Sequence, residues 1–159
     1  MKMTIKDLKS QFLEYLEIEK NRSPKTIENY NHYLTRFINF AKVGGPEDIT
    51  EEIVRKYRLR LNRITDERER PLKKVTQNYH VIALRSFLKY LAKRDIRAVP
   101  AENIELGKQE EREVVFLESP ELERFLRAPQ GVSLSDLRDR AILETLFSTG
   151  LRVSELCSL

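Results

Sequence analysis

The sequence is poor in the residues that define several protein classes. Its 159 residues include one cysteine, Cys157, no tryptophan, five glycines and six prolines. A single cysteine excludes a disulfide framework and a cysteine-based zinc cluster within this chain. So few glycines and prolines exclude collagen-like and low-complexity classes. No apolar run exceeds four residues, which excludes a membrane span, and acidic residues interrupt the first twenty positions, so no signal peptide is expected. A cytoplasmic protein is therefore the expectation.

Charge is plentiful and unevenly distributed. Residues 1–107 hold 22 Lys and Arg against 15 Asp and Glu, whereas residues 108–159 hold 7 against 10. The bias is strongest between residues 55 and 97, with 14 basic and 4 acidic side chains. Such a bias favours a surface for phosphates or another polyanion. A solvated arginine-rich face explains the charge equally well, so charge alone does not decide between the two.

Apolar residues recur at helical spacing in four segments of this basic part. Side chains that can cap a helix start precede three of them, namely Thr4, Ser23 and Thr50. Pro24 strengthens the second start, and Gly44-Gly45-Pro46 predicts the end of that helix. A fourth helix is expected from about residue 75 to residue 94. Four amphipathic helices with short connections predict a compact helical bundle.

The pattern weakens after the fourth helix. Residues 107–115 are polar and lack periodicity, which is typical of an interdomain linker. Beyond a short extended stretch at 114–117, helix starts are expected at Ser119, near Ser135 and around Arg152. The two histidines, His32 and His80, have no partner at metal-ligand spacing, and no glycine-rich phosphate loop is present. The sequence therefore predicts neither a metal nor a cofactor.

One long run carries a specific resemblance. Residues 138–156, Arg-Asp-Arg-Ala-Ile-Leu-Glu-Thr-Leu-Phe-Ser-Thr-Gly-Leu-Arg-Val-Ser-Glu-Leu, closely resemble the first catalytic box of tyrosine site-specific recombinases. The most similar subgroup is the Xer-type recombinases and related phage integrases. Residues 23–30, 76–88 and 116–122 resemble other parts of that family in the same order.

The resemblance implies an all-α fold in three parts. Residues 1–106 would form a four- to five-helix SAM-like core-binding bundle that contacts DNA. Residues 107–115 would be a linker, and residues 116–159 an incomplete helical start of the catalytic domain.

The resemblance also implies roles at the active site. In the family, a tyrosine attacks the scissile phosphate, assisted by two arginines, a lysine and a histidine or tryptophan. By match, Arg152 is the first arginine, which would clamp the phosphate, and Glu155 would support it. All six tyrosines precede residue 91 and no histidine follows His80. We therefore expect this chain to bind DNA without cutting it by itself.

Candidate DNA contacts lie at the starts of the second and fourth helices and on one face of the fourth helix, namely Lys25, Thr26, Asn29, Lys73, Lys74, Thr76, Asn78, Arg85 and Lys89. For Arg85 and Lys89, only the family resemblance favours DNA over a solvated face. A helix start favours a phosphate, and Arg85 and Lys89 could enter the major groove. Tyr30, Phe37 and Phe87 are expected in the core.

The expected partners are double-stranded DNA and, as the family implies, other recombinase protomers in a tetramer on two sites, with no membrane. Two alternatives stay open. One is a helical protein-interaction module whose basic face meets an acidic partner. The other is a plain DNA-binding regulator.

Overall fold

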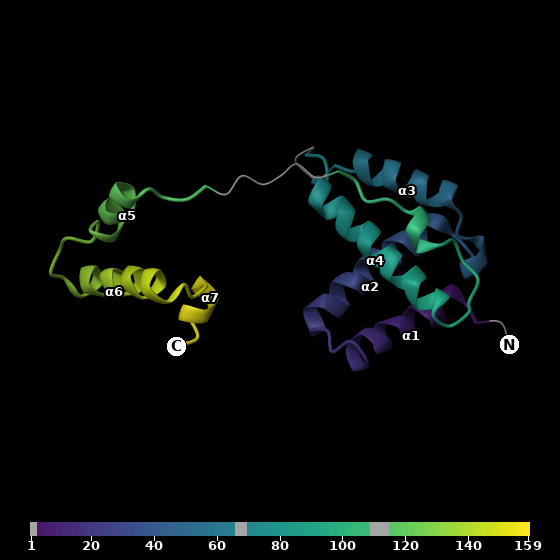
Figure 1. Ribbon diagram of the computed structural model, residues 1–159, viewed down its shortest axis with the longest axis horizontal. Coiled ribbons are helices and arrows are strands. Elements are labelled where there is room, and N and C mark those ends of the chain that lie inside the picture. Colours follow the sequence, from purple (N-terminus) through teal and green to yellow (C-terminus); the bar gives the residue numbers. More distant parts are fainter. Residues whose placement is uncertain (1–2, 66–69, 109–114) are drawn as a thin grey trace. The chain divides into compact units, whose positions relative to one another are not determined.

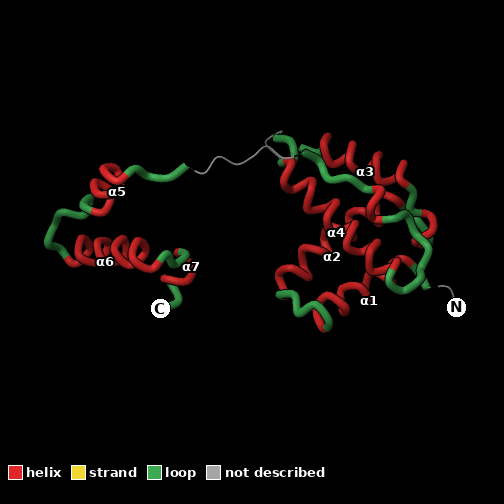
Figure 2. Tube along the Cα trace, in the orientation of Figure 1, coloured by secondary structure: helices red, strands yellow, loops and turns green. Residues whose placement is uncertain are grey.

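The computed structural model describes residues 3–65, 70–108 and 115–159 (Figure 1). Every named element in these ranges is a helix (Figure 2), and Thr65 and Pro71 form an isolated bridge. The predicted all-α fold is therefore confirmed. The chain divides into two compact units, unit 1 (Met1–Glu110) and unit 2 (Glu111–Leu159). Each unit is described by itself.

Unit 1 is a bundle of four helices. Their bounds, with those of two single 3-10 turns, are α1 Ile5–Ile18, α2 Pro24–Ala41, η1 Pro46–Asp48, α3 Glu51–Arg63, α4 Lys74–Ala92 and η2 Ala101–Asn103. Helix α4 packs on α2, and α1 and α3 each contact both of them (Figure 1). The η2 turn packs on α4, so the chain folds back along this helix after it ends.

Local capping explains the helix starts. The Thr4 hydroxyl accepts a hydrogen bond of 3.2 Å from the Asp7 N–H, and the Asp7 carboxylate accepts one of 3.0 Å from the Thr4 N–H. The Ser23 hydroxyl accepts from the Thr26 N–H at 3.3 Å, and Thr50 caps α3 in the same way. The three predicted starts are confirmed, because a cap depends only on residues within one turn.

The predicted end of the second helix is wrong. Helix α2 stops before the glycines, because Lys42 takes a left-handed φ of 51° and its N–H donates to the Ile38 carbonyl at 2.9 Å. The N–H groups of Gly44 and Gly45 instead donate to the Asp48 carboxylate at 3.2 and 3.0 Å. The glycines thus shape the turn that leads into η1.

The core of unit 1 is aromatic at its centre. Phe12 of α1 lies 5.4 Å from Phe87 and 5.2 Å from Tyr90 of α4, measured between ring centroids. Phe37 and Phe87 are fully buried and Tyr30 packs against the same core, as predicted. Packed rings of this size dominate the burial energy of a small bundle, so they fix the arrangement of its helices.

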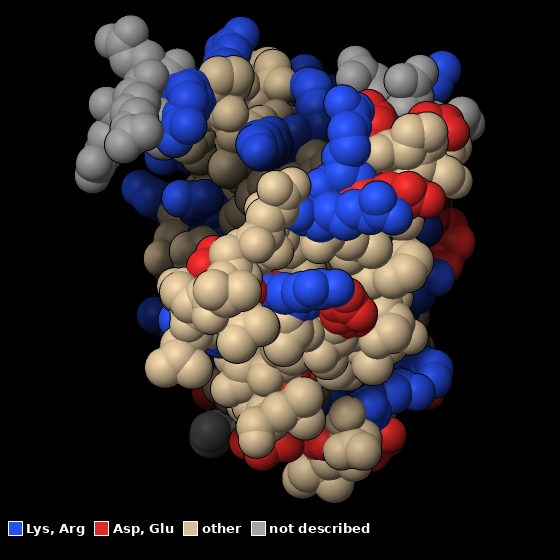
Figure 3. Space-filling view, turned by 90° about the vertical axis from the view of Figure 1, so that its left-hand side faces the viewer, with Lys and Arg blue, Asp and Glu red and all other residues tan. Residues whose placement is uncertain are grey.

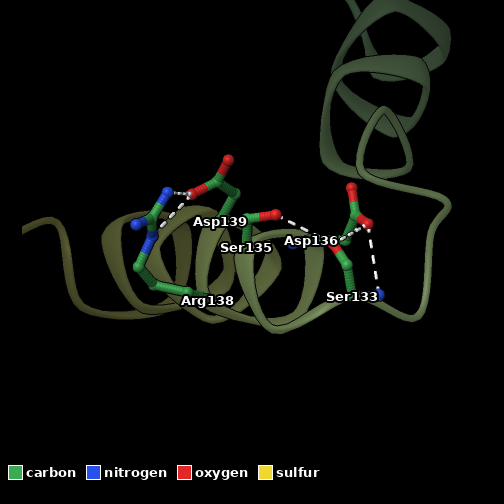
Figure 4. A network of polar contacts seen from close by, with 5 residues as sticks. All are labelled: Ser133, Ser135, Asp136, Arg138 and Asp139. Atoms are coloured by element: carbon green, nitrogen blue, oxygen red, sulfur yellow. Dashed lines mark hydrogen bonds and ion pairs between the residues drawn. The ribbon is translucent and has the colours of Figure 1, made fainter.

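Unit 2 contains α5 Ser119–Leu126, α6 Leu134–Thr149 and α7 Val153–Leu156. Helix α6 begins at Leu134, one residue before the predicted start near Ser135, because Ser133 is its N-cap and forms a capping box with Asp136 (Figure 4). It ends at Gly150, whose φ of 67° suits a glycine. The predicted linker lies largely at 109–114, outside the described residues, as does Val114 of the predicted extended stretch.

No described residue of unit 2 is buried. Its exposed large apolar side chains include Phe116, Phe125, Val132, Leu134 and Phe147. In Figure 3, uncharged residues, drawn tan, cover much of the face toward the viewer, with basic and acidic side chains scattered among them. The helices of unit 2 therefore contact one another without enclosing a core. Over the described ranges, no helix is long and apolar enough to cross a membrane.

Candidate nucleic-acid interface

A polar aromatic cluster holds α2, α3 and α4 together. The ring centroids of Tyr33 and His80 lie 4.4 Å apart, and those of His32 and His80 lie 6.1 Å apart. The Tyr57 hydroxyl on α3 lies 2.9 Å from Nδ1 of His80. Both Tyr57 and His80 are buried. The cluster therefore helps to fix α2, α3 and α4 relative to one another.

Burial determines the protonation of this cluster. Burial, with smaller contributions from the charge of Arg36 and from the neighbouring His32, lowers the pKa of His80 to about 4. Burial raises the pKa of the Tyr57 hydroxyl, against the opposing effect of Arg36. At neutral pH the imidazole is therefore neutral, and one hydrogen bond joins its Nδ1 to the tyrosine hydroxyl.

The start of α2 presents the three predicted residues at the surface. Lys25 is exposed and forms an ion pair of 2.7 Å with Glu28, one turn along. Asn29 is exposed and Thr26 is half-buried. An exposed pair of this kind contributes little to stability, so Lys25 can exchange its partner for a phosphate at low cost.

The start of α4 carries two more predicted cations. Lys73 stands at the N-cap and is exposed. The Lys74 ammonium donates to the Asn62 side-chain oxygen of α3 at 2.7 Å, which orients it at the same helix end. Thr76 is half-buried in the first turn. Lysines beside the positive end of a helix dipole favour an anion.

Asn78 requires a correction. It is 5% exposed, its side-chain N–H donates to the Gly107 carbonyl at 2.9 Å, and its side-chain oxygen accepts from the Gly107 N–H at 2.9 Å. Both polar groups of the amide are therefore used inside unit 1. Asn78 fastens the segment after α4 to the helix, and we remove it from the candidate DNA contacts.

Arg85 and Lys89 share a side of α4 with Asn78, since they follow it at helical spacing. The returning segment runs beside this side, and Lys89 pairs with Glu102 of η2 at 3.7 Å between exposed groups. Arg85 is half-buried and has no acidic partner within the described ranges. Of these two predicted residues, Arg85 is thus the one whose charge is uncompensated.

Sequence reasoning missed a stripe along α2. Lys25, Asn29, His32 and Arg36 follow one another at spacings of four, three and four residues, which places them on one side of the helix. Arg36 is half-buried and Arg60 of α3 is exposed nearby, lining the same groove. The helical spacing of these four residues could have predicted the stripe, whereas the position of Arg60 depends on how α3 packs.

The predicted catalytic residues lie together at the start of α7. Arg152 is the N-cap residue, and its N–H donates to the Glu155 carboxylate at 2.7 Å. The Arg152 guanidinium donates to the same carboxylate at 3.2 Å, and its side chain is 82% exposed. Glu155 thus orients Arg152 while leaving it accessible. No cluster of potential metal ligands is found in the part of the chain that the structure describes.

The helical unit 1 corresponds to a known domain class. Residues 10–95 match the family model described as phage integrase, N-terminal SAM-like domain. These residues include α2, α3 and α4 entirely. The match therefore covers the elements that form the candidate interface.

Individual relatives agree with this class. The chain is 37% identical to tyrosine recombinase XerC of Bacillus subtilis, over 98% of this chain and 50% of that protein. It is 30% identical to tyrosine recombinase XerD of Halalkalibacterium halodurans, over 98% and 52%. A crystal structure of XerA recombinase matches with a TM-score of 0.50 and 30% identity, over 97% of this chain and 50% of that one. The chain belongs to the tyrosine recombinase family, and it spans about half the length of these relatives.

Proposed function

We propose that this chain binds double-stranded DNA through the outer sides of α2 and α4 in unit 1. The observation that carries the proposal is the set of cations at the two helix starts, on helices that the Tyr33–His80 contact holds together. Lys25, Thr26 and Asn29 on α2, and Lys73, Lys74, Thr76 and Arg85 on α4, supply the contacts, with Lys89 at the margin. Membership of a recombinase family supports DNA as the ligand.

Most of these contacts suit the DNA backbone. Lysines and hydroxyls at helix starts contact phosphates, which position a protein on the duplex without reading its sequence. Arg85, farther along α4, is the candidate for a base edge, because a guanidinium donates in pairs to guanine in the major groove. The two roles predict different effects of substitution.

In unit 2, we infer that Arg152 binds the scissile phosphate and that Glu155 orients it. A guanidinium fork stabilises the charge that develops on a phosphate during transesterification. Strand transfer would also need a nucleophile and further catalytic groups, which family resemblance places outside residues 1–159. Assembly with other protomers on paired sites, in the cytoplasm, is part of the same proposal.

The test is duplex affinity as a function of salt. Each phosphate neutralised contributes about −0.9 to the slope of log K against log salt. We expect the 159-residue chain to show a steep slope on a short duplex of arbitrary sequence. Lys73→Gln should reduce the slope by about 1. Arg97→Gln, which removes an exposed charge outside α2 and α4, is the control and should change it less.

Two results would contradict the proposal. Absence of duplex binding at low salt would do so. Equal effects of Lys73→Gln and Arg97→Gln would show that the charge of the whole chain, and no defined surface, attracts DNA. Binding to an acidic protein in preference to duplex DNA would favour the protein-interaction alternative.

A further inference from the structure

Unit 1 also has a groove that none of the proposed DNA contacts lines. It has a volume of about 640 Å³ and runs along α2 to the end of α3. His32 and Arg36 of α2 and Arg60 of α3 line it. These three side chains bring basic groups from two helices to one groove.

Arg36 is the central residue because its charge is uncompensated. It is half-buried, and the structure shows no carboxylate partner for it among the described residues. Its charge reaches the buried cluster, where it lowers the pKa of both His80 and Tyr57. Partial burial of a guanidinium without a counter-ion is unfavourable, and a bound anion removes that cost.

The walls of the groove also suit an anion. The Lys9 ammonium of α1 donates to the Asn31 side-chain oxygen at 2.8 Å and to the Thr35 hydroxyl at 2.9 Å. Asn31 and Thr35 line the groove, and the side-chain N–H groups of Asn31 form no hydrogen bond with the residues that the structure describes. Partial burial and the charge of Lys6 lower the pKa of Lys9.

Two further residues that line the groove are the aromatic Phe40 and the acidic Glu28. The Arg60 guanidinium lies 5.7 Å from the centre of the Phe40 ring, which supports its plane. Among the described residues, Glu28 is the one acidic side chain that lines the groove, and it is paired with Lys25 at 2.7 Å. The groove therefore presents hydrogen-bond donors to an anion, and the negative charge of Glu28 is already paired with Lys25.

We propose that this groove binds a backbone phosphate of the duplex, with Arg36 and Arg60 as its direct ligands. Arginine forks donate two parallel hydrogen bonds to a phosphate, which a lysine cannot do. The inference rests on the proposed function and extends it from the helix starts along α2 toward α3. The DNA backbone then follows the stripe of Lys25, Asn29, His32 and Arg36.

The first test uses the salt dependence of duplex affinity. Arg60→Gln, at an exposed position, should reduce the slope of log K against log salt by about 1, and the double variant Arg36→Gln/Arg60→Gln by about 2. Arg97→Gln is the matched control. Glu28→Gln should raise affinity, because it removes the only acid of the groove. Circular dichroism establishes whether each variant is folded. If Arg36→Gln unfolds the chain, the effect of Arg60→Gln alone tests the proposed phosphate site.

The second test separates this inference from the proposed function. Nitrogen-15 spectra of the arginine side chains are recorded with inorganic pyrophosphate and, separately, with the short duplex. Shifts of the Arg36 and Arg60 Nε–Hε signals with both probes support the groove. If the chain binds duplex but neither arginine signal shifts, the proposed phosphate site in the groove is refuted and the proposed function stands. If pyrophosphate shifts both signals but the duplex does not bind, the groove stands as an anion site and the proposed function fails.

Discussion

The buried His80 predicts a stability that falls in acid. The perturbation is protonation of an imidazole whose pKa is lowered to about 4 in the folded protein, from an ordinary value of 6.5. The unfolded chain therefore binds a proton more readily than the folded chain between these values. Stability that is fully present above pH 6.5 is lost as the pH falls toward 4. The loss at pH 5 relative to pH 8 is about 2 kcal/mol, with a limiting slope of about 1.4 kcal/mol per pH unit.

Urea unfolding of the 159-residue chain between pH 5 and pH 8 measures this loss. His80→Gln can still form a hydrogen bond with the Tyr57 hydroxyl but cannot titrate, so it should lose the slope even if it is less stable throughout. His32→Gln is the control, because His32 is exposed, and should keep most of the slope. Hydrogen bonds also lower the pKa of Asp7 and Glu52, but those carboxylates act mainly below pH 5. Equal slopes for the original chain and His80→Gln, or a nuclear magnetic resonance titration of His80 near pH 6.5, would refute the reasoning.

Four further predictions follow from the packing and the site. Leu84→Ala, at a fully buried position, should cost about 2–5 kcal/mol of unfolding free energy in urea, and an unchanged midpoint would contradict the core assignment. Asn78→Ala should cost about 1–3 kcal/mol and speed hydrogen exchange at Gly107, whereas unchanged exchange there would show that the two amide bonds do not hold the segment. Amides of α5–α7 should exchange faster than those of α4, because no described residue of unit 2 is buried; equal protection would contradict this. The 159-residue chain should form no phosphotyrosyl adduct on a nicked duplex, as a denaturing gel would show, since its six tyrosines all precede Arg152; an adduct would overturn the assignment.

The parts of the fold that depend on neighbours in sequence were predictable. Thr4, Ser23 and Thr50 cap helices with donors three residues away, so their sequence context contains the whole interaction. Helical spacing of apolar residues likewise identified the core of α4. The end of α2 escaped prediction, because Lys42 adopts the left-handed conformation that the nearby glycines were expected to supply.

The parts that depend on packing were not predictable. Asn78 was interpreted as a DNA contact because it lies at the start of the fourth helix, but its partner Gly107 lies 29 residues away. The neutral state of His80 depends on its burial and on the charge of Arg36, which is 44 residues away on another helix. The groove of Arg36 and Arg60 exists only because α3 packs beside α2. Charge and motif thus indicated the ligand, and the packing selects the residues that can reach it.

The central claim is that the outer sides of α2 and α4 form one DNA-binding surface. The most direct measurement of this claim is a titration of the 159-residue chain with a short duplex at low salt. The titration is monitored in nitrogen-15 spectra of the backbone amides. We predict the largest shifts at Lys25–Asn29 and Lys73–Thr76, with little change at the end of α1. Shifts confined to other helices, or a spectrum that the duplex leaves unchanged, would contradict it.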